Sequence, residues 1–91
     1  PIKAVAAGTI IFSDWTPSSG YVVIVRHKDD ILSVYKNAAS VTKSQGNIVR
    51  SGEVIALAGN ANNVQNSGAT LHFELWKDGF PIDPTQFINF N

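Results

Sequence analysis

The chain has 91 residues, a length that supports one small hydrophobic core and therefore one domain spanning residues 1–91. Hydrophobic residues make up 44% of it and charged residues only 15%, so it is expected to fold rather than to stay disordered. Seven basic and seven acidic residues give a formal net charge of zero, which argues against binding to nucleic acid or to an anionic membrane.

The residue types and patterns that the chain lacks exclude further kinds of site and structure. The chain contains no cysteine, so it has no disulfide, no thiol nucleophile and no cysteine ligand for zinc. No apolar run reaches the roughly 18 to 20 residues that a membrane-spanning helix needs, so this segment is not expected to insert into a membrane. The chain starts at Pro1 and has no methionine, which we interpret as a processed product or a cut domain with a segment upstream.

The N-terminal quarter predicts short strands and one loop. Residues 2–7 and 9–12 are rich in β-forming side chains, and Gly8 separates the two runs. Residues 13–20 are dense in turn-forming residues and predict a loop. Trp15 lies within that loop and is expected to cover the edge of the core with its large apolar ring.

A β-hairpin is predicted next. Residues 21–27 form a nearly continuous apolar run, and residues 28–30 turn the chain into an antiparallel strand over 31–36. His27 stands beside the two aspartates of that turn, so a metal site is one interpretation. A solvated turn is the more common arrangement for a histidine beside exposed carboxylates, and we favour it.

The middle of the chain predicts connections and reversals. Residues 37–43 are small and polar, with room for one helical turn, while Gly46 and Gly52 each mark a tight reversal around a short strand. Residues 60–67 predict a polar loop that could form the wall of a groove. Its four asparagines are Asn60, Asn62, Asn63 and Asn66.

The stretch 68–76 is the centre of the functional prediction. Read with the two-residue period of a strand, its apolar residues share one face, namely Leu71, Phe73 and Leu75. The opposite face carries Thr70, His72, Glu74 and Trp76. Such a row of polar side chains suits the floor of a groove.

The C-terminal segment completes an all-β prediction. Residues 77–79 form a hairpin-type turn, and Asp83–Pro84 predicts the start of a short helix. No longer helix is indicated. The predicted fold is a compact antiparallel β barrel or sandwich with short connections and an open groove.

Several of these segments, in this order, resemble the lysostaphin-like (LytM) peptidoglycan endopeptidase domain. The match covers essentially the whole chain. The resembling segments are 1–10, 20–27, 33–36, 49–56, 71–75 and 81–84. The resemblance implies the compact antiparallel fold of this family and an extracytoplasmic setting in the bacterial cell envelope, such as the periplasm.

The resemblance also implies a degenerate active site. Active members of the family hold one zinc ion with a histidine and an aspartate that precede the first strand, and with the second histidine of a His-x-His pair. By resemblance His72 fills that last position, and the first two ligands would lie upstream of Pro1. Thr70 replaces the first histidine of the pair, and Asn37, two residues after Tyr35, replaces the other catalytic histidine.

These replacements weigh against catalysis. Zinc hydrolysis needs about three protein ligands and an open position, and each acid/base histidine is typically worth about 10²- to 10⁴-fold in rate. Threonine and asparagine do not titrate near neutral pH. We therefore expect no catalytic residue and no cofactor, with His72 as a vestigial metal ligand.

The resulting hypothesis is a non-catalytic domain that binds a peptidoglycan peptide or a partner protein. Family members of the EnvC-like and NlpD-like kind lack zinc residues and activate cell-wall amidases, so an amidase or another envelope protein is the implied partner. The groove is expected to be lined by the asparagine-rich loop and by Tyr35, Asn37, Thr70, His72 and Glu74.

Three alternatives stay open at this point. If the upstream segment supplies two ligands, the domain could be an active zinc metalloendopeptidase that cleaves peptidoglycan cross-links. A biotinyl or lipoyl carrier domain would need a lysine at a hairpin tip, where Lys28 stands without the expected neighbours. Without the resemblance, His72 would be read as an ordinary hydrogen-bonded residue at the rim of a sheet.

Overall fold

The computed structural model describes residues 1–58 and 71–82, most of which lie in β-strands. One 3₁₀ turn, η1 (Lys28–Asp30), interrupts them. The strands in the described residues are β1 (Ile2–Lys3), β2 (Gly8–Thr16), β3 (Gly20–Arg26), β4 (Ile31–Ala38), β5 (Ser40–Val41), β6 (Ile48–Val49), β7 (Val54–Leu57), β8 (His72–Lys77) and β9 (Phe80–Ile82). No helix within these ranges is long and apolar enough to cross a membrane.

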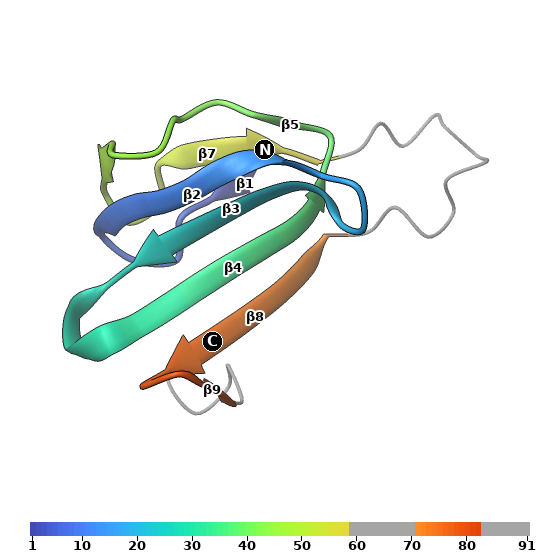
Figure 1. Cartoon of the computed structure of the whole chain (residues 1–91). Coiled ribbons are helices and arrows are strands. Elements are labelled where there is room, and N and C mark those ends of the chain that lie inside the picture. The colour runs from blue at the N-terminus through green and yellow to red at the C-terminus, as the bar shows by residue number, and fades with distance from the viewer. Residues whose placement is uncertain (59–70, 83–91) are drawn as a thin grey trace.

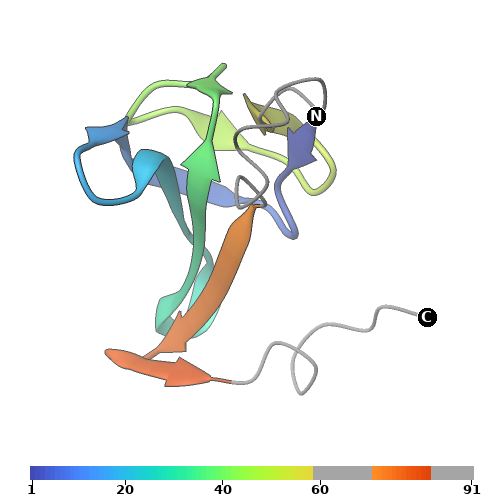
Figure 2. The same cartoon turned by 90° about the vertical axis from the view of Figure 1, so that its right-hand side faces the viewer.

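The strands form two sheets in which every pair is antiparallel. The larger sheet has the order β6-β2-β3-β4-β8-β9 and the smaller one the order β1-β7-β5. Figures 1 and 2 show the smaller sheet beside the β2 and β3 side of the larger one, with β9 far from it. The predicted all-β antiparallel fold is confirmed.

Cross-strand pairing gives the larger sheet two very different faces. Residues directly opposite each other in an antiparallel pair point to the same face. One transverse row, which we call the inner row, is buried over its first four members and consists of Ile10, Val25, Ser33, Leu75 and Ile82. The next row, which we call the outer row, points the other way and consists of Ile48, Thr9, Arg26, Leu32, Trp76 and Pro81.

The core lies between the inner face of the larger sheet and the smaller sheet. Its largest fully buried side chains include Tyr35, Ile10 and Ile55, which come from β4, β2 and β7. The ring of Phe73 on β8 packs against Tyr35 with ring centroids 5.3 Å apart. Strands of both sheets thus contribute side chains to this core.

The turn predictions are largely confirmed. Gly46 and Gly52 adopt positive φ angles of 95° and 83° on either side of β6, as the tight reversals require. Asp78 and Gly79 connect β8 to β9 with φ angles of 52° and 85°, the left-handed pair that a two-residue hairpin favours. The β3–β4 hairpin through η1 is confirmed as well.

The prediction of a loop over 13–20 is wrong. β2 continues to Thr16 because its backbone stays paired with the apolar strand β3, as far as Thr16 opposite Gly20. Trp15 therefore lies in a strand, and 56% of it is exposed, so it does not cover the core. The turn is shorter than expected, and the Thr16 hydroxyl accepts a hydrogen bond from the Ser19 N–H at 3.1 Å.

The helical turn expected within 37–43 does not form. Backbone groups of this segment bond to β7 instead, with the Ala39 N–H donating to the Leu57 carbonyl at 2.8 Å and the Thr42 N–H to the Ile55 carbonyl at 3.1 Å. Pairing with a neighbouring strand satisfies these groups more completely than one isolated turn. The helix predicted at Asp83–Pro84 lies outside the described residues.

Candidate functional site

The pairing of β4 with β8 brings a cation opposite the histidine of the central stretch. Lys36 is the direct cross-strand partner of His72. Glu74 and Trp76 follow on β8 at two-residue intervals and share the face of His72. The predicted polar row on this strand is therefore confirmed for its described members. Leu71, expected on the apolar face, has an exposed side chain at the start of the strand.

The carboxylate of Glu74 connects these side chains. Its Oε2 accepts hydrogen bonds from Lys36 Nζ at 3.2 Å and from His72 Nε2 at 2.8 Å, while its Oε1 accepts one from Trp76 Nε1 at 2.9 Å. We call Lys36, His72, Glu74 and Trp76 the Glu74 cluster. One carboxylate thus holds three donors, two of which share a single oxygen.

The cluster stabilises the ionised form of Glu74. The pKa of this carboxyl is lowered from 4.5 to about 2, chiefly by the indole N–H of Trp76, with further hydrogen bonds from Lys36 and His72 and the positive charge of Lys36. Partial burial opposes this shift, but the three donors outweigh it. Glu74 is consequently a fixed anion at neutral pH.

The same contacts decide which nitrogen of His72 is available. A carboxylate only accepts hydrogen bonds, so Nε2 carries a proton in this arrangement and has no free lone pair. Nδ1 keeps its lone pair, and a histidine that donates its other ring N–H to a carboxylate is a common metal ligand, so the bond to Glu74 does not by itself exclude coordination. What weighs against a cation here is the ammonium of Lys36, which shares the same oxygen. An ammonium at this place repels a divalent cation.

The described residues do not fit a zinc site. Within 1–58 and 71–82, no group of three or more histidine, cysteine or acidic side chains could hold a metal ion. His72 and Glu74 lie side by side, but the other two members of the cluster, Lys36 and Trp76, are not metal ligands. Among the described residues, this arrangement offers a ligand a fixed negative charge and the remaining N–H groups of the Lys36 ammonium.

Tyr35 is not where the sequence led us to expect it. It pairs with Phe73, one position out of step with the pair Lys36 and His72, so its side chain points to the inner face. It is 1% exposed, and its hydroxyl accepts a hydrogen bond from the Val5 N–H at 3.1 Å. Tyr35 and His72 lie on opposite faces of the sheet, which excludes a single groove floor made of both.

The remaining predicted groove residues are only partly described. Asn37 lies in β4 with a φ of 68°, and its N–H donates to the Ser19 carbonyl at 2.7 Å. Asparagine tolerates this left-handed conformation better than most residues. Outside the described residues lie Asn60, Asn62, Asn63, Asn66 and Thr70.

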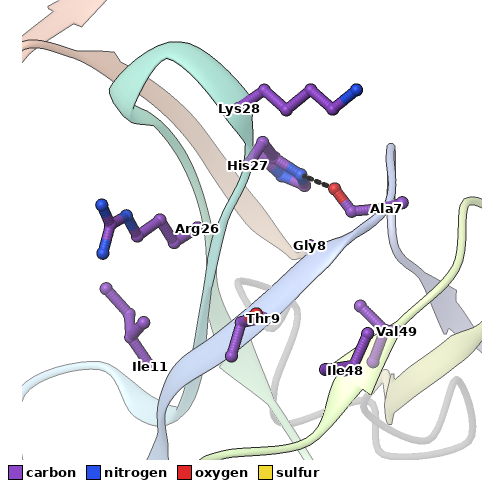
Figure 3. Close-up of a pocket in the computed structure, with 9 residues that line it drawn as sticks. All are labelled: Ala7, Gly8, Thr9, Ile11, Arg26, His27, Lys28, Ile48 and Val49. Atoms are coloured by element: carbon purple, nitrogen blue, oxygen red, sulfur yellow. Dashed lines mark hydrogen bonds between the residues drawn. The ribbon is translucent and has the colours of Figure 1, made fainter.

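His27 is neither a metal ligand nor a simple solvated turn residue. Its Nδ1 lies 2.8 Å from the Ala7 carbonyl oxygen, drawn as a dashed line in Figure 3, and its Nε2 lies 2.7 Å from Ser33 Oγ. A carbonyl only accepts, so Nδ1 donates to Ala7, and the Ser33 hydroxyl, which can donate or accept, completes the second bond. Ser33 also bonds the hydroxyl of Tyr35, which gives a continuous chain of hydrogen bonds from Val5 to Ala7.

Sequence reasoning missed Lys36 and Ser33. The sequence predicts Lys36 only as part of a strand. In the structure it is the antiparallel partner of His72 and therefore decides the charge at the site. Ser33 is fully buried in the middle of an apolar strand. A small polar residue in such a place signals a buried partner, and His27 is that partner.

Comparison with known proteins gives a family for the whole chain. A model of peptidase family M23 matches residues 1–84. Stage II sporulation protein Q of Bacillus subtilis is 34% identical over 97% of this chain and 31% of its own length. Murein hydrolase activator EnvC of Escherichia coli is 33% identical over 96% of this chain and 20% of that protein. The DD-carboxypeptidase/endopeptidase Mpg of Neisseria meningitidis is 33% identical over 92% of this chain and 19% of that protein.

Solved structures agree with the sequence match. A chain of the SpoIIQ–SpoIIIAH pore forming complex superimposes with a TM-score of 0.82 and 35% identity, over 93% of this chain and 54% of that one. The chain spans less than a third of the length of the curated relatives named above. The resemblance to LytM domains is confirmed, and the carrier-domain interpretation of Lys28 is thereby wrong.

Proposed function

This chain belongs to peptidase family M23, and on that premise we propose that it is a non-catalytic member which binds a peptide or a protein partner in the bacterial cell envelope. Its relatives include proteins with envelope functions in their names, such as a murein hydrolase activator and an outer membrane lipoprotein. An extracytoplasmic location follows as part of the proposal.

The observation that carries the proposal is the pair of donors on one oxygen of Glu74. His72 is the residue that matches the zinc-ligand position of the family, and its Nε2 donates to Glu74, which leaves only Nδ1 for a metal. Lys36 places a positive charge on the same oxygen. A metal that has to lower the pKa of its water needs neutral or anionic ligands around it, not an ammonium.

The two positions for acid/base catalysis support the same conclusion. By family resemblance they are occupied by Asn37 and Thr70. Neither side chain takes up or releases a proton near neutral pH, so neither replaces a histidine that would stabilise the attack on a peptide carbonyl.

The proposed partner is a peptidoglycan peptide or a protein such as a cell-wall amidase. One relative is named a murein hydrolase activator, and another forms a complex with the protein SpoIIIAH. The Glu74 cluster offers the Lys36 ammonium, the Trp76 ring and the half-exposed imidazole of His72 on one sheet face. A peptide with carboxylate or amide groups would find hydrogen-bond donors there.

A second candidate function is zinc endopeptidase activity. It is favoured by the relative named DD-carboxypeptidase/endopeptidase, which is 33% identical to this chain. It requires two metal ligands from outside the described residues and coordination through Nδ1 of His72, because Nε2 is bonded to Glu74. It also requires a substitute for the histidines that Asn37 and Thr70 replace.

The two functions are separated by an assay on purified peptidoglycan sacculi. We expect the protein with equimolar zinc to release no soluble fragments, and to increase the release produced by a cell-wall amidase or to bind the sacculi in a pull-down. An active M23 endopeptidase serves as the positive control. Release by the zinc-loaded protein alone would contradict the proposal, and so would the absence of both sacculus binding and amidase stimulation.

A further inference from the structure

A second surface of the molecule has the features of a binding cleft. A cavity of about 470 Å³ opens where β6, β2 and β3 meet, at one end of the outer row. We call it the Ile48 cleft. Figure 3 shows its lining, which consists of Ala7, Gly8, Thr9, Ile11, Arg26, His27, Lys28, Ile48 and Val49. None of its lining residues belongs to the Glu74 cluster, whose members lie on β4 and β8.

The cleft has exposed apolar walls. Ile48 is 80% exposed and is the most exposed large hydrophobic residue among the described residues, and Ile11 is 39% exposed. Ile48 lies in the two-residue strand β6 at the edge of the larger sheet. The side chain of Val49 next to it is fully buried, so the strand is anchored while Ile48 points outward. An anchored but uncovered isoleucine marks a contact site.

The charges of the cleft are all of one sign. Arg26 and Lys28 stand on its rim, and no carboxylate is among its lining residues. Arg26 reaches Asp30 only at 3.8 Å, with both side chains exposed, so this pair contributes little. No ion pair joins Lys28 to residues 1–58 or 71–82. Lys28 is therefore available to an anionic partner, and Arg26 can exchange its weak, exposed pair with Asp30 for such a partner.

The floor of the cleft is rigid. A Cβ at Gly8 would collide with the backbone oxygen of Arg26, so β2 and β3 approach each other as closely as only glycine allows. His27 is tied to the backbone of Ala7 through Nδ1 and to Ser33 through Nε2. A ligand does not have to order these groups, which lowers the entropic cost of binding.

We propose that the Ile48 cleft docks an acidic segment of a protein partner, with one apolar side chain between Ile11 and Ile48 and carboxylates beside Arg26 and Lys28. Charge complementarity selects this occupant, because the rim is cationic while the walls are apolar. Two cations on a chain with zero net charge are too few for a nucleic-acid surface. The inference goes beyond the proposed function, since it uses none of the Glu74 cluster.

A short synthetic peptide provides the probe. In it a single leucine stands between two pairs of glutamates, with both ends blocked. We expect its titration into isotope-labelled protein to shift the NMR signals of Ile11, Arg26 and Ile48, and the shifts to weaken as salt is added. A peptide with lysines in place of glutamates, and one with glycine in place of leucine, are expected to bind at least about tenfold more weakly, a difference of about 1.4 kcal/mol.

Charge reversal makes the test specific. The double variant Arg26→Glu/Lys28→Glu is expected to lose binding of the acidic peptide and to gain binding of the lysine peptide. The control Lys3→Glu/Arg50→Glu changes the net charge equally at two exposed residues outside the cleft and is expected to leave binding unchanged. Ile48→Ser is expected to reduce affinity about tenfold without a change in the remaining spectrum.

Several results would overturn the inference. They are the absence of shifts at millimolar peptide, shifts centred on other residues, an equal loss in the control variant, and no effect of Ile48→Ser. Concentration-dependent shifts of the same residues without peptide would assign the cleft to a second copy of the chain instead. None of these measurements involves zinc, peptidoglycan or an amidase, so they are independent of the assay for the proposed function.

Discussion

The two histidines of the described chain stand in contrasting surroundings. His27 has both ring nitrogens bonded to neutral groups, the Ala7 carbonyl and the hydroxyl of the fully buried Ser33. His72 is 61% exposed at its side chain and bonds to the anion Glu74. Both histidines stand at the end of a strand. Their hydrogen-bond partners distinguish them, since those of His27 stabilise the fold and that of His72 belongs to a surface site.

The difference follows from the faces of the larger sheet. His27 closes a chain of hydrogen bonds that runs through Tyr35 on the core side, where an unmet donor is costly. His72 lies on the opposite face, where solvent can replace its partner. We therefore expect substitutions at the His27 end to change stability, and substitutions in the Glu74 cluster to change charge and ligand contacts.

The largest effect is expected for His27→Ala. The change leaves the buried Ser33 hydroxyl and the Ala7 carbonyl without their partner, which we expect to cost about 2 to 3 kcal/mol of unfolding free energy. Urea denaturation measures it. His27→Gln, which can offer a donor and an acceptor, serves as the control and should recover part of the loss. A loss as small as that of a surface substitution would remove the distinction between the two histidines.

Tyr35→Phe is expected to have the next largest effect. The variant keeps the ring against Phe73 but removes the acceptor of the Val5 N–H and the partner of Ser33, at a cost of about 1 to 2 kcal/mol. The same urea experiment measures it. Combined with His27→Ala, the two losses should not add, because both residues belong to one hydrogen-bonded chain. Strict additivity would show that the chain does not act as a unit.

The Glu74 cluster should make the free energy of unfolding depend on pH in the acidic range. The pKa of Glu74 is about 2 in the folded chain, below its ordinary 4.5, so its stabilising contribution is complete above about pH 4.5 and is lost as the pH falls toward 2. The unfolding free energy should therefore decline over this range, and Glu74→Gln should decline less. Equal slopes for both proteins would show that the cluster does not hold the carboxylate ionised.

The smallest effect is expected for His72→Ala. The imidazole is exposed, and Glu74 keeps two other donors, so the unfolding free energy should change by no more than about 0.5 kcal/mol. Thermal and urea unfolding both measure it. A loss comparable to that of His27→Ala would mean that His72 also has a structural role.

Local patterns in the sequence were sufficient for the central strand. The alternation along 71–76 correctly placed Leu75 in the core and His72, Glu74 and Trp76 on the other face. The glycine reversals were also predictable, because few other residues adopt their positive φ angles. Periodicity and turn chemistry are properties of neighbouring residues, which a single sequence displays directly.

What the sequence did not show depends on pairing between distant residues. Tyr35 and His72 were assigned to one groove, but the register that pairs Lys36 with His72 puts Tyr35 on the core face. A shift of one residue in this register would reverse the result, and what fixes the register is the burial of one face across both strands rather than a feature of either strand alone. The polar end of β2 is mispredicted as a loop for the same reason. Its local composition favours a turn, but its pairing with β3 keeps Trp15 in a strand.

The most direct test of the central claim is a zinc titration of the chain, with the ring nitrogens of His72 followed by NMR. We predict that Nε2 of His72 stays protonated and bonded to Glu74, and that no stoichiometric zinc binds through this ring. One zinc ion per chain bound through either ring nitrogen of His72, including Nδ1 with the bond from Nε2 to Glu74 intact, would contradict the account and favour the endopeptidase function.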